Sequence, residues 1–104
     1  MPDFAVTLCA VLRIPPDGLA AFQAYEDAVL PLLTDHDGSL LRRLRTGDRL
    51  TEIHLIQFPS AAALDAFRAD PRRAAQASLF EASGATVELW IVEDVECPGV
   101  SRPC

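Results

Sequence analysis

The sequence predicts a small α+β domain of the ferredoxin-like type, in which strands and helices follow the order βαββαβ. Three observations support this fold class. Four segments are rich in apolar and β-branched residues, helix-forming stretches fill the first and last gaps between them, and 104 residues suit one domain. The expected sheet is antiparallel with the strand order 4-1-3-2 and has its helices on one face. We expect a domain over residues 1–95 and a flexible tail over 96–104.

The first part of the chain is expected to hold a strand and a helix. Residues 4–14 are apolar on both faces, which indicates a strand that is covered on both sides. Asp17 is the expected N-cap of a helix that reaches about Asp35. Pro31 should divide this helix near Leu30, because proline cannot donate the backbone hydrogen bond.

The predicted helix carries one apolar stripe. At helical spacing this stripe holds Phe22, Val29, Leu33 and either Tyr25 or Glu26. Asp37 and Gly38 end the helix, and Gly38 is free to take a positive φ.

A hairpin should follow, with strands at 39–46 and 50–58 and its tight turn at Gly47-Asp48. After this hairpin, Ser60 is the expected cap of a helix over 61–69.

The last part of the chain is predicted to hold one more helix and one more strand. Asp70 should cap a helix that begins at Pro71, and Gly84 should end it. Residues 85–95 then form the closing strand.

The predicted topology leaves one face of the sheet bare. The right-handed crossover rule is taken to place strands 4–14 and 50–58 side by side and parallel. Because the helices cover only one face, the other face should carry Ile56, Trp90, Val92 and part of the first strand. An apolar patch of this kind usually marks an interface, so we expect a homodimer.

Composition excludes several classes of partner. The 15 acidic residues outnumber the 9 basic residues, which are all arginine, and the net charge is −6. An acidic domain repels nucleic acid and anionic membrane surfaces. No apolar run reaches the length of a membrane span, and the apolar N-terminal run follows Asp3 rather than basic residues. We therefore expect a cytoplasmic protein that binds neither nucleic acid nor membrane.

Motifs for cofactors and metals are missing from the sequence. It has no glycine-rich phosphate loop and no histidine or cysteine spacing typical of a zinc site, so neither a cofactor nor a metal is predicted. Cys97 and Cys104 flank a short segment of the tail, where a free tail is favoured over a disulfide or metal clip.

Several local features make the chain similar to a known superfamily. It resembles the dimeric α/β-barrel superfamily over residues 4–95, and within it a small family that has no assigned function. The features that carry the resemblance are Gln57-Phe58 followed by Pro59-Ser60, an Ala/Leu/Phe helix, Asp70-Pro71, the closing Val92-Glu93-Asp94-Val95, and His36-Asp37-Gly38 before a strand with Arg42 and Arg43.

The resemblance implies a dimer in which two sheets face each other and form a barrel. It also implies that each subunit often has a pocket between its own helices and sheet. More distant relatives are antibiotic-biosynthesis monooxygenases that need no cofactor, haem-degrading enzymes, lactone isomerases and polyketide cyclases. The pocket of this chain could therefore lie inside the barrel or between helices and sheet.

His54 and Glu52 are the expected catalytic pair. They share one face of the strand 50–58, and a carboxylate can orient a histidine and raise its pKa for acid–base chemistry. If Ile53, Leu55, Val87, Leu89 and Ile91 point at the helices, then Glu52, His54, Glu88 and Trp90 point into the dimer barrel. The competing interpretation is a hydrogen-bonded cluster at the interface.

Further residues are candidates for binding the substrate. Glu88 and Trp90 are two of them. His36 lies near a helix end, where it could cap the helix or stand at the mouth of a pocket, and Tyr25 could supply a hydroxyl. One of Arg42 and Arg43 should point inward, where it could hold a carboxylate or enolate. The alternative is that these charges on an edge strand prevent edge-to-edge aggregation.

Two functions compete at this point. The first is a cofactor-independent isomerase, cyclase or monooxygenase that acts on a small apolar or polyketide-like organic molecule, with His54 as proton carrier. The second is a binding or stress-related module without catalysis. Haem binding through His36 or His54 is a further alternative.

Overall fold

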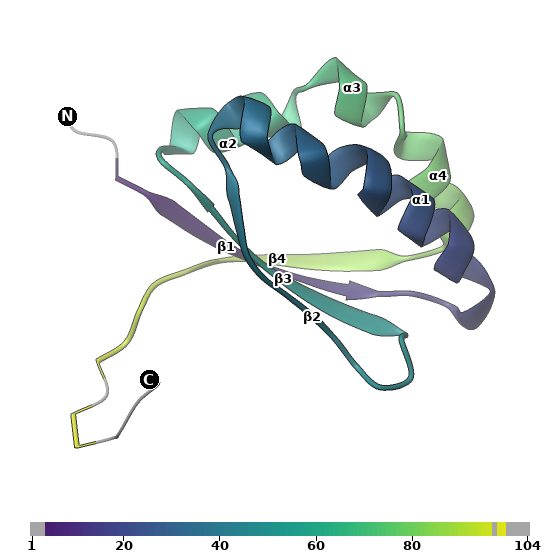
Figure 1. Cartoon of the computed structure of the whole chain (residues 1–104), viewed down its shortest axis with the longest axis horizontal. Coiled ribbons are helices and arrows are strands. Elements are labelled where there is room, and N and C mark those ends of the chain that lie inside the picture. The colour runs from purple at the N-terminus through teal and green to yellow at the C-terminus, as the bar shows by residue number, and fades with distance from the viewer. Residues whose placement is uncertain (1–3, 97, 100–104) are drawn as a thin grey trace.

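Helices cover one face of a four-stranded sheet (Figure 1). The computed structural model describes residues 4–96, 98 and 99. Its elements, in chain order, are β1 (Val6–Arg13), the 3₁₀ turn η1 (Pro16–Gly18), α1 (Leu19–Val29), the 3₁₀ helix η2 (Leu30–His36), β2 (Ser39–Arg45), β3 (Thr51–Phe58), α2 (Ala61–Arg68), α3 (Pro71–Ala74), α4 (Ala77–Ser83) and β4 (Thr86–Val92).

The strand order is β2-β3-β1-β4, which confirms the predicted order 4-1-3-2. Every neighbouring pair is antiparallel, so the sheet is antiparallel as predicted. The expectation that the first and third strands run parallel is wrong. The crossover through α1 leads from β1 to β2, and β3 turns back from β2 and fills the place between them. β3 therefore runs against β1.

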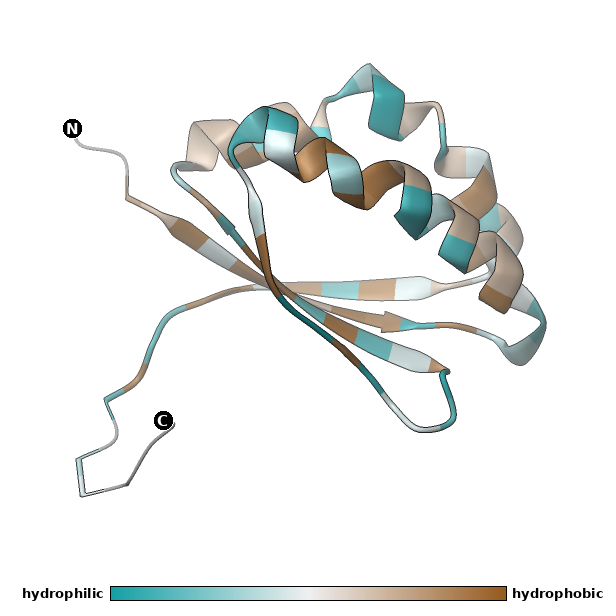
Figure 2. Ribbon diagram, viewed as in Figure 1, coloured by the Kyte–Doolittle hydropathy of each residue, from teal (hydrophilic) through white to brown (hydrophobic). Residues whose placement is uncertain are grey.

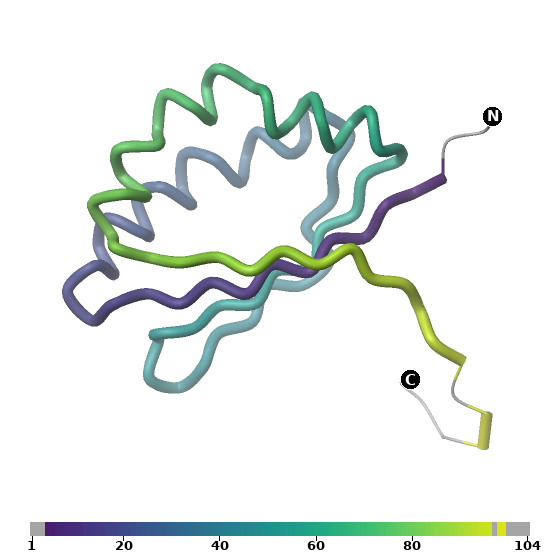
Figure 3. The backbone as a smooth tube through the Cα atoms, turned by 180° about the vertical axis from the view of Figure 1, so that it is seen from behind, coloured from purple at the N-terminus to yellow at the C-terminus, as the bar shows by residue number. Residues whose placement is uncertain are grey.

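The helix layer packs on the sheet through two clusters of buried apolar residues. α1 lies beside α4, and both views show the helices on the same side of the sheet (Figures 1 and 3). Brown, hydrophobic segments alternate with teal ones along α1, as expected for an amphipathic helix (Figure 2). Leu8, Val29, Phe58 and Phe67 belong to the larger of these two clusters.

Three of the predicted helix ends are confirmed. The Ala63 backbone N–H donates to the Ser60 side chain at 3.1 Å, and the Arg72 backbone N–H donates to Asp70 at 2.8 Å. Gly84 ends α4 with a φ of 70°. Pro31 also divides the first helix as predicted, because α1 ends at Val29 and continues as η2.

Other helix ends differ from the prediction. Asp17 does not cap α1, because it lies inside the turn η1 and the N-cap is Gly18, which has no side chain to accept a bond. Asp37, rather than Gly38, takes the left-handed conformation after η2, with a φ of 58°. An aspartate tolerates this conformation because its short polar side chain can bond locally. The helix expected from Pro71 onward is two helices, α3 and α4.

The prediction of which face of β3 meets the helices is wrong. Glu52 and His54 are buried on the face that the helices cover. Ile53 and Leu55 pair with the bare-side residues of β1 and β2, so they face away from the helices. Ile56 was expected on the bare face and is instead buried in the core, where 6% of it is exposed. The helix-facing side of β3 therefore accommodates a polar half and an apolar half.

The bare face of the sheet is apolar at its centre, as predicted. It carries Leu44, Ile53, Leu55, Trp90 and Val92, and 58% of Trp90 is exposed. Within the described residues, no segment of the chain packs over this face (Figure 3).

In the part of the chain that the structure describes, no helix combines the length and the apolar character needed to cross a bilayer. β4 ends at Val92, three residues before the expected end. Cys97 and Cys104 lie outside the described residues, so the expectations about the tail and the domain limits stay predictions.

Candidate functional site

A cavity of about 300 Å³ lies between the helix layer and the sheet. Its walls are mostly apolar and come from β1, β3, β4 and all four α-helices, with Leu8, Ile56 and Phe67 among them. Val87 and Leu89 of the edge strand β4 also line the cavity and are 43% and 44% exposed, so the cavity opens along this edge. Its size and apolar lining suit a small organic ligand.

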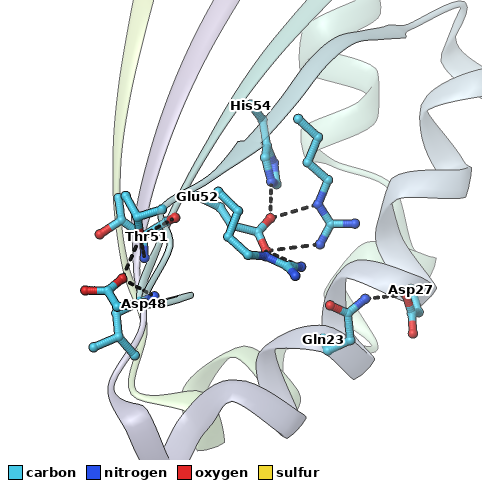
Figure 4. Close-up of polar contacts among 10 residues, drawn as sticks. Gln23, Asp27, Asp48, Thr51, Glu52 and His54 are labelled. Atoms are coloured by element: carbon cyan, nitrogen blue, oxygen red, sulfur yellow. Dashed lines mark hydrogen bonds and ion pairs between the residues drawn. The ribbon is translucent and has the colours of Figure 1, made fainter.

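His54 lies in the wall of this cavity and is 3% exposed. Its ring Nε2 lies 2.9 Å from Oε1 of Glu52, two residues earlier on the same face of β3 (Figure 4). Strand alternation brings the two side chains together, as predicted. The pair faces the helices and not the bare side of the sheet, so the structure places it within one subunit.

Glu52 is the centre of a buried ion cluster. Arg43 donates to it through Nε at 2.8 Å, and Arg45 donates through Nη2 at 3.0 Å. Burial raises the pKa of Glu52, but the hydrogen bonds from Arg43, His54 and Arg45 outweigh it and lower the pKa to about 2. Glu52 is therefore a carboxylate at neutral pH.

The ionised Glu52 determines the state of His54. Because a carboxylate only accepts, Nε2 of His54 must carry the proton and donate it. Burial lowers the pKa of His54 more strongly than the bond to Glu52 raises it, which reverses the expected direction of the shift. His54 is thus neutral, and its Nδ1 bears a lone pair with no hydrogen-bond partner among residues 4–96, 98 and 99.

Glu26 projects from α1 into the same cavity and is only 4% exposed. It lies four residues after Phe22 and three before Val29, so helical spacing turns all three toward the sheet. Its carboxyl group makes no hydrogen bond to any described residue. Burial raises the pKa of Glu26 to about 7, although the charge of Arg43 opposes this shift.

Tyr25 and Arg73 complete the polar groups of the cavity wall that this site uses. Tyr25 is buried against Phe80, with ring centroids 5.1 Å apart, and burial raises the pKa of its hydroxyl. The guanidinium carbon of Arg73 lies 5.5 Å from the centre of the Phe67 ring. Its Nε is buried and has no acceptor among the described residues. The cavity thus combines an apolar body with a few polar groups.

The other predicted site residues lie elsewhere. Arg43 is the inward arginine of the pair left open by the sequence, while Arg42 pairs with Leu55 on the bare side. Glu88 and Trp90 are on the bare face, where Glu88 forms an ion pair with Arg13. Strand alternation therefore separates Glu88 and Trp90 from the cavity.

His36 is outside the cavity wall. Its Nε2 lies 2.8 Å from Oδ2 of Asp70, which also accepts from Arg72, and its ring contacts Phe67 edge-on. It ties the end of η2 to the start of α3.

Sequence reasoning missed Glu26 and Arg73 as site residues. Glu26 had a signal, because it is an acidic residue on an otherwise apolar helical stripe. Arg73 had none, because it belongs to the four-residue helix α3, whose orientation depends on how α2 and α4 pack.

The described residues contain no group of three or more histidine, cysteine or acidic side chains that could hold a metal ion. Both histidines already bond to carboxylates, His36 to Asp70 and His54 to Glu52.

Known proteins resemble the chain in structure. No protein-family model and no curated protein matches its sequence. Rv0793 of Mycobacterium tuberculosis is 21% identical, with 91% of this chain and 99% of that chain covered and a TM-score of 0.73. SnoaB of Streptomyces nogalater, a cofactor-independent oxygenase, is 17% identical over 94% of this chain and 99% of its own, with a TM-score of 0.72. The chain has the ferredoxin-like fold of these proteins.

A third ferredoxin-like match is protein Atu4242 of Agrobacterium tumefaciens. It is 17% identical over 92% of this chain and 99% of its own, with a TM-score of 0.70. These likenesses confirm at the level of the fold the resemblance seen in the sequence. At such identities a shared ferredoxin-like fold does not imply a shared activity, because one fold hosts many functions.

Proposed function

We propose that this protein is a cofactor-independent enzyme that moves a proton on a small, mostly apolar or polyketide-like molecule held between its helices and sheet. The observation that carries the proposal is the His54–Glu52 pair. A neutral histidine, oriented by an ionised carboxylate, presents a free Nδ1 in the wall of an apolar cavity of about 300 Å³. Isomerisation, cyclisation and oxygenation can each begin with such a proton transfer.

The geometry defines a role for each partner. Nδ1 of His54 accepts a proton from the substrate, and Nε2–H keeps its bond to Glu52. The imidazolium that forms is stabilised by the negative charge 2.9 Å away. Arg43 and Arg45 hold Glu52 in place and keep it ionised. The apolar walls exclude water and strengthen these electrostatic interactions.

The structural neighbours support this reaction class. SnoaB, which shares the fold, is a cofactor-independent oxygenase. The specific reaction and the substrate of this chain are not implied by the likeness, so the proposal extends only to the proton transfer that these reactions share.

The test follows proton transfer directly. Aromatic acids and polyketide-like compounds are screened for thermal stabilisation of the protein, and each hit is incubated in D₂O. Mass spectrometry should show deuterium incorporated into the hit, or a product, with the wild type. His54→Ala should abolish the incorporation while its circular dichroism stays unchanged. His36→Gln is the matched control, because this histidine is outside the cavity wall.

Two results would count against the enzyme. Incorporation that survives in His54→Ala would remove His54 from the mechanism. A hit that stabilises the protein without exchange or product would favour a non-catalytic binding module instead.

We also propose that a second copy of this chain covers the bare face of the sheet. Its centre is apolar, and Trp90 and Leu44 are 58% and 39% exposed in the single chain. Burying such a face stabilises a dimer, and the resemblance seen in the sequence implies the same arrangement. Because His54 faces the helices, each subunit would hold its own complete site.

A further inference from the structure

Besides His54, the cavity wall carries several polar residues, and two of them are Glu26 and Arg73. Glu26 enters the cavity from α1, and Arg73 enters it from α3. The carboxyl group of Glu26 has no hydrogen-bond partner among the described residues, and neither has the buried Nε of Arg73. Buried polar groups are almost always bonded, so the unbonded Glu26 carboxyl and the unbonded Nε of Arg73 in one cavity are consistent with a ligand group that completes them.

The rest of the protein does not supply those partners. Arg43, whose charge acts on Glu26, is engaged with Glu52 at 2.8 Å. Arg73 has no carboxylate partner in the described part of the chain and lies over the Phe67 ring instead. Glu26 and Arg73 influence each other electrostatically without forming an ion pair. The Glu26 carboxyl group is therefore available to a ligand as an acceptor, and the Arg73 guanidinium is available as a donor.

We propose that Glu26 and Arg73 form a subsite that binds a phenolic or enolic hydroxyl group of the ligand. The hydroxyl donates its hydrogen to the Glu26 carboxyl oxygen, and the hydroxyl oxygen accepts from the Arg73 guanidinium. The proposal rests on the proposed function in one respect, which is that this cavity is the ligand site.

Charge and hydrogen-bonding capacity favour a hydroxyl over other groups. A ligand carboxylate would be repelled by Glu26 when that group is ionised, and an ammonium group would face the positive charge of Arg73. A hydroxyl is neutral, so it enters an apolar cavity at low cost. It is also both donor and acceptor, so a single hydroxyl has the hydrogen-bonding capacity that both groups require.

The test uses two probes with the same apolar body. 1-Naphthol and naphthalene differ by one hydroxyl group, and isothermal titration calorimetry gives the affinity of each. Wild type should bind 1-naphthol about tenfold more tightly, the effect of a hydrogen bond to a charged group. Glu26→Leu and Arg73→Met should each bring the ratio close to one and still bind naphthalene.

Three further variants separate this subsite from its surroundings. Glu26→Gln should keep much of the preference, because an amide oxygen still accepts the hydrogen bond. Asp27→Asn, an exposed neighbour on the same helix, should leave the ratio unchanged. His36→Gln should also leave it unchanged, because His36 is outside the cavity wall and bonds to Asp70.

The outcomes distinguish this inference from the proposed function. Equal binding of both probes to wild type, or a ratio that persists in Glu26→Leu and Arg73→Met, would overturn the subsite alone. If neither probe bound, the cavity would not be the ligand site, and the proposed function would fail together with the subsite. If Arg73→Met did not fold, Glu26→Leu would decide the question.

Discussion

The buried carboxyl groups of Glu26 and Glu52 have pKa values on opposite sides of 4.5, the ordinary pKa of a glutamate. Glu52 is surrounded by donors, and their hydrogen bonds hold its pKa near 2 despite burial. Glu26 has no donor among the described residues, and burial raises its pKa to about 7. Environment thus gives the same type of side chain two roles, a fixed anion and a group that titrates near neutral pH.

The raised pKa of Glu26 predicts how stability depends on pH. The folded state binds the proton more tightly than the unfolded chain, whose carboxyl has a pKa of about 4.5. The contribution of Glu26 to stability is therefore fully present below that pKa and is lost as the pH rises from 4.5 to about 7. The difference in the free energy of unfolding between Glu26→Gln and wild type should therefore shift by about 3 kcal/mol in favour of the variant from about pH 4 to pH 8.

Urea unfolding of both proteins at the two pH values measures this difference. The charges of Arg43, Glu52, Arg73 and Asp27 also act on Glu26, so the double difference isolates Glu26 itself. Asp27→Asn should not reproduce the gain, because Asp27 is exposed. Parallel stability curves for wild type and Glu26→Gln would show that the carboxyl is not desolvated.

At the scale of the elements, one glycine allows α1 and α4 to approach each other closely. Gly18 lies at the start of α1, and a Cβ atom there would stand 1.9 Å from the backbone oxygen of Ser83 at the end of α4. Because the obstacle is backbone, a side chain cannot simply rotate away. α1 and α4 form one side of the cavity, so this contact also positions Tyr25, Glu26 and Phe80.

Gly18→Ala should therefore destabilise the fold by about 2 kcal/mol or more, as overpacking does. Gly47→Ala is the matched control, because no atom lies within 4 Å of the Cβ it would add. Thermal and urea unfolding of the two variants gives the comparison. Equal stability of both would mean that α1 and α4 can separate without cost.

The element scale also explains why β3 was assigned wrongly. Alternation divides β3 into one set with Glu52, His54 and Ile56 and another with Ile53 and Leu55, but it does not say which set meets the helices. We expected the larger apolar pair to do so. The helices instead cover the mixed set, since Glu52 and His54 satisfy each other and receive bonds from two arginines.

At the scale of the whole molecule, the helices cover only one face of the sheet, and the other face is open to a partner. If a second copy covers it, light scattering at micromolar concentration should give twice the 11.3 kDa of one chain. Trp90→Glu should reduce the mass to that of one chain with little loss of secondary structure, because Trp90 is already 58% exposed in the single chain. A charge buried at the interface without a partner opposes association.

Ala66→Glu serves as the control for added charge. Ala66 is exposed on α2, on the opposite side from the bare face, so this variant should keep the double mass. A wild type that behaves as one chain, or a Trp90→Glu variant that stays double, would contradict the dimer. The cytoplasmic location expected from the sequence stays a prediction.

By itself, the sequence determined the order of elements, the strand order, the division at Pro31, the caps Ser60 and Asp70, and the proximity of His54 to Glu52. Except for the strand order, which follows from the βαββαβ topology, these depend on local periodicity and on backbone rules that a single chain segment contains. Only the tertiary structure decided which face of each strand meets the helices, and so that His54 opens into the cavity while Trp90 does not. It also brought together Glu26 and Arg73. The reason is that a face or a cavity is formed by segments far apart in the chain, and no local pattern records how they pack.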